Sequence, residues 1–157
     1  MRKETNYIII HCSATRPSQD IGFKEINRWH IERGFLNCGY HFIIKRNGII
    51  EDGRTTDSVG AHTLGRNHDS IGICMVGGVS QDNIKIWEDN FEPEQWESLK
   101  ALVYGLHEEY PKAEIKGHYH FTHDKKCPSF DVDDWAVTEC DWIEGIRLPN
   151  DEPEPKP

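Results

Sequence analysis

Histidine and cysteine, the side chains best suited to bind a transition metal, are concentrated in one segment of this sequence. His118, His120 and His123 are followed closely by Cys127. If the segment is extended, His118 and His120 share one face. Zinc accepts neutral imidazole and thiolate as ligands. The cluster therefore indicates a metal site, although a polar surface loop could have the same composition.

A fourth histidine, His11, directly follows the apolar run Tyr7 to Ile10. A polar group at the end of a buried strand needs a partner, which can be a hydrogen bond at the sheet edge or a metal. Catalytic zinc sites use three protein ligands and leave the fourth position to water, whose pKa falls to about 7. Two histidines and one cysteine suit such a site. Spacing alone does not choose among the four histidines.

Cys127 has two other interpretations. It could be a nucleophile activated by a nearby histidine, or a buried structural thiol. Lys125 and Lys126 are expected to lower its pKa, and Pro128 favours a fixed turn. The five cysteines are odd in number and include no C-x-x-C pair, which argues against a disulfide framework and a cysteine-rich structural zinc site.

Three further polar residues have ordinary interpretations beside functional ones. Tyr40 begins an apolar segment and would usually be a packing residue, but its phenol could also bind water or an oxyanion. His62 lies in a long loop and would usually be solvated. Asn67 would usually be a turn residue.

Hydrophobic periodicity and turn residues predict the helices and strands that carry these residues. Helical spacing predicts helices over 22–33, 93–110 and a last helix that Asp131 caps and that includes Trp142. Apolar runs and the Asn47-Gly48 hairpin predict strands at 7–11, 40–45, 49–51, 70–76 and 114–118. Residues 52–69 and 118–129 are expected to be loops. This order predicts an α/β fold in one domain, a central mixed β-sheet flanked by helices.

Length and composition set further limits. The 157 residues suit one domain over 1–148, and the acidic, proline-rich residues 149–157 are expected to be a disordered tail. The net charge of −9 argues against nucleic-acid binding. No apolar run approaches the roughly eighteen residues of a membrane span. The N-terminus resembles no export signal, so we expect synthesis in the cytoplasm and release by another route.

Several segments together resemble a known family. The sequence resembles the zinc-dependent N-acetylmuramoyl-L-alanine amidases of the phage-lysozyme type, which are related to peptidoglycan recognition proteins. The resemblance extends from about residue 5 to about residue 142, and the segments that carry it are 9–15, 39–44, 60–62, 67–73, 117–118 and 127–130.

The resemblance implies a set of site residues. The zinc ligands would be His11, His118 and Cys127. Tyr40 would lie beside the metal-bound water, Lys125 would stabilise the oxyanion, and the residues lining the substrate cleft would include His62 and Asn67. The stretch from His118 to Cys127 is about one residue longer than in the phage enzymes. It leaves open the choice between Lys125 and Lys126, and an approach of His120 to the metal.

The expected function is hydrolysis of the amide bond between N-acetylmuramic acid and L-alanine in peptidoglycan, by a monomer that serves a phage or prophage in lysis. The main alternative is a peptidoglycan-binding module without activity. A cysteine peptidase that uses Cys127 with His118, and a regulatory protein-binding domain, are further alternatives.

Overall fold

The computed structural model describes residues 1–143, and it confirms a single α/β domain. The strands are β1 (Tyr7–Cys12), β2 (Phe42–Ile44), β3 (Ile50–Asp52), β4 (Ser70–Met75) and β5 (Glu114–Gly117). The helices are α1 (Phe23–Glu32), α2 (Pro93–Glu109) and α3 (Val132–Glu139), with short 3₁₀ turns η1 (Asn67–Asp69) and η2 (His118–His120). The predicted tail at 149–157 lies outside the described residues.

The five strands form one mixed sheet in the order β3-β2-β4-β1-β5. Only the β2–β3 hairpin is antiparallel; the pairs β2–β4, β4–β1 and β1–β5 are parallel. The central strands β1 and β4 are buried almost throughout, as expected for parallel strands with both faces covered. Their carboxyl ends therefore meet at one edge of the sheet.

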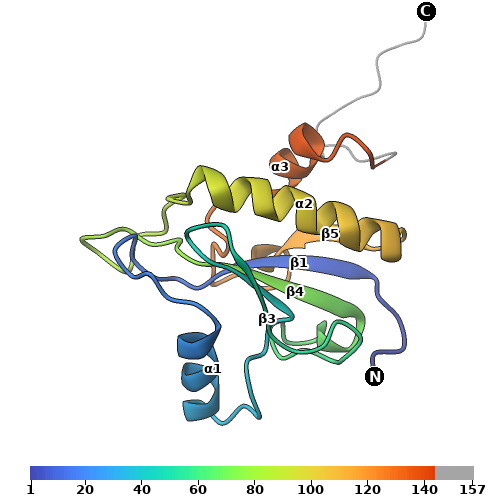
Figure 1. Cartoon of the computed structure of the whole chain (residues 1–157), viewed down its shortest axis with the longest axis horizontal. Helices are drawn as coiled ribbons and strands as arrows, with labels where there is room; N and C mark the ends of the chain where they lie inside the picture. The colour runs from blue at the N-terminus through green and yellow to red at the C-terminus, as the bar shows by residue number, and fades with distance from the viewer. Residues whose placement is uncertain (144–157) are drawn as a thin grey trace, which may run out of the picture.

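Helices cover the two faces of this sheet. Figure 1 shows α2 lying along one side of the strands and α1 on the other. Ile8 and Ile10 of β1 share a core with Leu99 of α2, whereas Ile43 and Cys74 pack with residues of α1. Because strand side chains alternate between faces, His11 points away from Ile8 and Ile10, towards the α1 side. None of the helices within residues 1–143 is long and apolar enough to cross a membrane.

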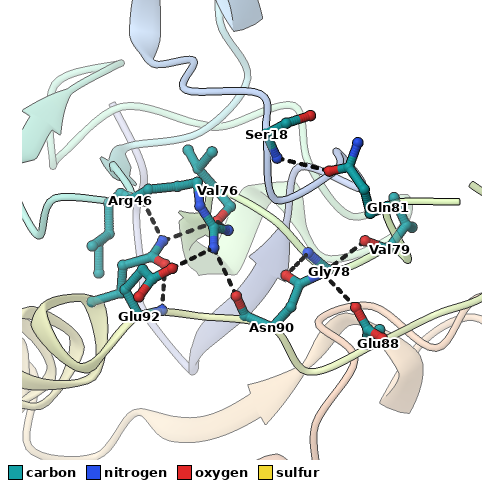
Figure 2. Close-up of polar contacts among 11 residues, drawn as sticks. Ser18, Arg46, Val76, Gly78, Val79, Gln81, Glu88, Asn90 and Glu92 are labelled. Atoms are coloured by element: carbon teal, nitrogen blue, oxygen red, sulfur yellow. Dashed lines mark hydrogen bonds and ion pairs between the residues drawn. The ribbon is translucent and has the colours of Figure 1, made fainter.

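The long connection between β4 and α2 is held by a polar network (Figure 2). The Arg46 guanidinium donates to the backbone oxygen of Asn90 at 2.8 Å and to a Glu92 carboxylate oxygen at 2.9 Å. The Asn90 side chain in turn accepts from the backbone N–H of Gly78 at 3.0 Å. Trp87 of the same connection forms an isolated antiparallel bridge with Val79 and lines the cleft described below.

Most predicted boundaries agree with the structure to within one residue, but two were wrong by more than that. The last helix ends at Glu139, and its C-cap residue, Cys140, leaves helical geometry with φ −105° and ψ 56°; Trp142 is therefore outside the helix. The second strand begins at Phe42 rather than Tyr40. The backbone of Tyr40 still accepts from Arg54 N at 2.9 Å, so pairing continues there without regular strand geometry.

Candidate metal centre and active-site cleft

The structure brings His11, His118 and Cys127 together, with one potential ligand atom from each lying within 4.8 Å of the others. The sheet explains the first two positions. Ile10 pairs with Gly117 across the parallel strands β1 and β5, so His11 and His118, the residues that directly follow them, lie at the same end of the two strands. Their ring centroids are 4.5 Å apart. Cys127 returns to this point from the loop that follows η2.

The neighbouring histidines are not part of this group. His118 to His120 form a 3₁₀ turn rather than an extended segment, so the condition under which His118 and His120 would share one face is not met. His120 turns away, where its Nε2 lies 2.9 Å from a carboxylate oxygen of Asp133 and its Nδ1 contacts the backbone of Gly117. His123 is exposed.

Burial keeps both imidazoles of the group neutral. It lowers the pKa of His11 well below 6.5, and the nearby His62, His118 and Lys125 add to this effect. Burial, with a further contribution from Lys125, lowers the pKa of His118 to about 4. At neutral pH each ring therefore keeps one nitrogen lone pair that a cation can use.

The thiol of Cys127 behaves differently from the expectation that adjacent lysines lower its pKa. Burial, with a further contribution from the neighbouring Cys12, raises the pKa of Cys127 well above its usual value, so that expectation was wrong. The Cys12 backbone N–H, 3.0 Å from Cys127 Sγ, can donate to a thiolate. A bound cation would favour that thiolate, because metal coordination deprotonates thiols. Without a metal, Cys127 is a poor nucleophile.

A zinc ion fits this donor set. His11 is fully buried, and its Nδ1 atom has no hydrogen-bond partner, whereas its Nε2 atom lies 2.8 Å from Nδ1 of His62. A buried polar nitrogen without a partner is costly, and a cation would use its lone pair. Two imidazoles and one thiolate are donors that zinc binds well in catalytic sites.

The metal group borders a cleft of about 720 Å³. All the site residues predicted from the sequence line it, with the exception of the fully buried His11: Tyr40, His62, Asn67, His118, Lys125 and Cys127. Aromatic side chains from α1 and from the β4–α2 connection, Trp29 and Trp87, also contribute to its walls. Polar and aromatic side chains therefore line this cleft together, next to the metal group.

Tyr40 and Lys125 both line the cleft beside the metal group. The Tyr40 ring centroid lies 5.1 Å from that of His11. Burial raises the pKa of Tyr40 well above 10, so its phenol stays protonated and can donate. Lys125 lines the cleft, and its charge lowers the pKa of both metal-group histidines, whereas Lys126 is not among the lining residues.

Asn67 and His62 have structural contacts that the sequence did not indicate. The Asn67 side-chain oxygen accepts from the backbone N–H groups of His62 and Thr63, both at 2.8 Å. His62 contacts His11 through Nδ1 and Ser70 Oγ through Nε2, the latter at 3.2 Å. Sequence reasoning missed Thr63 and Ser70 altogether. The only indication in the sequence was that Ser70, a small polar residue, begins the otherwise apolar strand β4.

Residues 1–143 contain one other group of potential ligands, Glu4, His68 and Asp69. One oxygen of the Asp69 carboxylate already accepts from Arg66 at 2.9 Å and from Asn6 at 3.1 Å. Glu4 and His68 are exposed, and none of the three residues lines the cleft that borders Cys127. Of the two groups within residues 1–143, the one formed by Cys127 and its two histidines is therefore the stronger candidate for a metal site.

Comparison with known proteins agrees with this geometry. The family model described as N-acetylmuramoyl-L-alanine amidase matches residues 1–130. The endolysin of Escherichia phage T7 is 48% identical over 134 residues, which cover 85% of this chain and 87% of that protein. The endolysin of Enterobacteria phage K11 is 45% identical over 137 residues, which cover 87% and 89%. Among solved structures, the N-acetylmuramoyl-L-alanine amidase LysC from Clostridium intestinale superposes with a TM-score of 0.72 at 27% identity, covering 86% of this chain and 85% of that one.

Proposed function

Because this chain belongs to the N-acetylmuramoyl-L-alanine amidase family, we propose that it is a zinc enzyme that hydrolyses the amide bond between N-acetylmuramic acid and L-alanine in peptidoglycan. The observation that carries this proposal is the meeting of His11, His118 and Cys127 beside a cleft of about 720 Å³. Similarity to phage endolysins over most of both chains supports a role in cell lysis, with the wall as the place of action.

The three ligand residues would hold zinc, which supplies Lewis acidity and makes a water molecule nucleophilic at neutral pH. Other side chains of the protein orient the reacting groups, stabilise charge and shape the cleft. Tyr40, a protonated phenol beside the metal group, orients the attacking water or the scissile carbonyl by hydrogen bonding. The Lys125 ammonium stabilises the negative charge that develops on the carbonyl oxygen. His62 and Asn67 hold the loop that forms one side of the cleft.

The two main alternatives make different demands on Cys127. A binding module without activity needs no metal ligand at this position. A cysteine peptidase needs a reactive thiol, but burial raises the pKa of Cys127, which opposes thiolate formation without a metal. The zinc amidase uses both the donor set and the cleft, so it is the function that the geometry supports best.

The test is digestion of purified peptidoglycan. We expect new L-alanine amino groups without new reducing sugar ends, loss of activity with a zinc chelator, and recovery when zinc is added back. A thiol peptidase would instead resist the chelator and be inactivated by alkylation. Binding to the wall without any cleavage product would contradict the proposal in favour of the binding module.

A further inference from the structure

The register of β1 against β4 places three residues of these two strands on one face of the sheet beneath His62. Tyr7 pairs with Ser70, Ile9 with Gly72 and His11 with Cys74. Because side chains alternate along a strand, Ser70, Gly72 and His11 lie on the same face. The His62 ring contacts Ser70 at one end and His11 at the other, and it passes over Gly72 between them.

Glycine at two positions leaves room for this ring. A Cβ atom on Gly72 would lie 2.6 Å from Cδ2 and Cγ of His62, and a Cβ atom on Gly60 would lie 2.6 Å from Cδ2. Real Cβ atoms do not approach other atoms so closely, so a larger residue at either position would displace the imidazole. The two backbone hydrogen bonds to Asn67 hold the same loop from the other side. The position of His62 is thus defined by packing as well as by hydrogen bonds.

His11, His62 and Ser70 form a row of hydrogen-bonded side chains, and the direction of each hydrogen bond follows from Ser70, the last residue of the row. The Ser70 hydroxyl donates to the backbone oxygen of Arg66 at 2.6 Å, and a carbonyl can only accept. Ser70 has no second proton, so it must accept from Nε2 of His62, which therefore carries the ring proton. A neutral imidazole has one proton, so Nδ1 of His62 is an acceptor. His11 must then donate to it from Nε2, across 2.8 Å.

The opposite tautomer of His11 is disfavoured by the same geometry. With its proton on Nδ1, His11 would face His62 with two lone pairs 2.8 Å apart. The Thr63 hydroxyl lies 2.9 Å from His62 Nδ1 and 3.2 Å from His11 Nε2, but its single proton cannot satisfy both nitrogens. The atom left with a lone pair in the favoured tautomer, His11 Nδ1, is also the buried nitrogen that lacks a hydrogen-bond partner.

We propose that Ser70 and His62 are positioning residues that fix His11 with its proton on Nε2 and its Nδ1 lone pair directed at the metal. This inference rests on the proposed zinc site and deepens it. It also assigns His62 a task other than the expected contact with substrate, because both of its ring nitrogens are already engaged. Partners that set the tautomer of a ligand histidine typically raise metal affinity 10- to 100-fold.

Two-bond ¹H–¹⁵N NMR of the full-length protein, which distinguishes protonated from unprotonated ring nitrogens, tests the tautomer directly. Before and after zinc removal, we expect the protons of both His11 and His62 on Nε2. A His11 proton on Nδ1 in the metal-free protein would overturn the inference. This measurement needs no variant and no bound zinc, so it judges the tautomer even if the wild-type protein shows no zinc affinity, a result that would instead contradict the proposed function.

Zinc affinity of variants, measured by competition with a chelating dye, tests the consequence. We expect Ser70→Ala and His62→Leu to weaken zinc binding by about 10- to 100-fold. His62→Asn keeps an acceptor oxygen near the Nδ1 position, so it should recover most of that loss. His107→Leu, at a histidine of α2 that belongs to neither group of potential ligands, should bind zinc as the wild type does. Equal affinity in all four variants would overturn the inference, as would an equal loss in His62→Asn and His62→Leu.

Discussion

Replacing Gly72 by alanine adds one methyl group at the point where the His62 ring crosses β4. The new Cβ atom would lie 2.6 Å from two ring carbons and 2.9 Å from Nδ1. An ordinary contact needs about 3.4 Å or more, so the ring must retreat by roughly 1 Å, which lengthens its hydrogen bonds to His11 and Ser70. The φ angle of Gly72 is not positive, so backbone strain plays no part in this substitution.

The expected cost follows from these contacts. Overpacking of this size costs about 1–3 kcal/mol, and a weakened buried hydrogen bond adds about 1 kcal/mol. The lower entropy of the unfolded alanine chain offsets up to about 1 kcal/mol. We therefore expect the free energy of unfolding of the zinc-free protein to fall by about 2 kcal/mol, which shifts the urea midpoint by about 1 M at a typical dependence on urea. Zinc affinity should fall with it.

Gly105→Ala is the matched control. Gly105 lies on the exposed side of α2, and a Cβ atom there would have no neighbour within 4 Å. Alanine is the better helix former, so this substitution should raise the free energy of unfolding by about 0.5–1 kcal/mol. The two identical changes thus have opposite expected signs. If Gly72→Ala unfolds at the wild-type urea concentration and keeps wild-type zinc affinity, the reasoning about His62 is refuted.

Three further predictions concern the cleft and the sheet. Lys125→Ala should lower the rate of amide hydrolysis about 100-fold, because it removes a charge beside the oxyanion. Lys126→Ala should leave the rate unchanged. Equal effects of the two substitutions on turnover would refute the assignment of Lys125 to the oxyanion. Gln95→Leu should lower the free energy of unfolding by about 2 kcal/mol in urea titrations, because the buried Gln95 amide bonds two backbone oxygens at 3.2 and 2.9 Å. Burial lowers the pKa of His41 to about 4, so as pH falls below about 6.5 the unfolded chain takes up a proton that the folded protein does not. His41 alone should therefore reduce the free energy of unfolding by up to about 3 kcal/mol near pH 4. A free energy of unfolding, measured in urea, that stays constant between pH 7 and pH 4 would contradict this.

Much of the fold could be predicted because the elements that carry it have local patterns. The apolar runs of β1 and β4 and the Asn47-Gly48 turn predict strands and a hairpin from a few neighbouring residues. The long helix α2 has Pro93 at its start and a regular apolar stripe. The errors fall where a local pattern is ambiguous. At Trp142, an apolar residue continued the helical spacing beyond the last helical turn.

The candidate site was harder to predict from the sequence, because it depends on pairing between strands that are far apart along the chain. Periodicity does not reveal that β1 lies next to β5, which is what brings His11 to His118. The 3₁₀ turn that removes His120 from the group has no clear pattern in the residues. The contact of His62 with Ser70 depends on the register of β4 against β1 and on a glycine between them. The family resemblance supplied the ligand residues, but it could not supply these contacts.

Amide hydrolysis by this protein is proposed to depend on a zinc ion that Cys127 holds together with His11 and His118. Elemental mass spectrometry of the purified protein, paired with the amidase assay on the same samples, measures this dependence. We expect about one zinc per chain and full activity in the wild type. The same is expected of Cys140→Ala, the control variant, because the thiol that it removes is buried at the end of α3. Cys127→Ala should have neither zinc nor activity. Retention of both metal and activity in Cys127→Ala would contradict the claim.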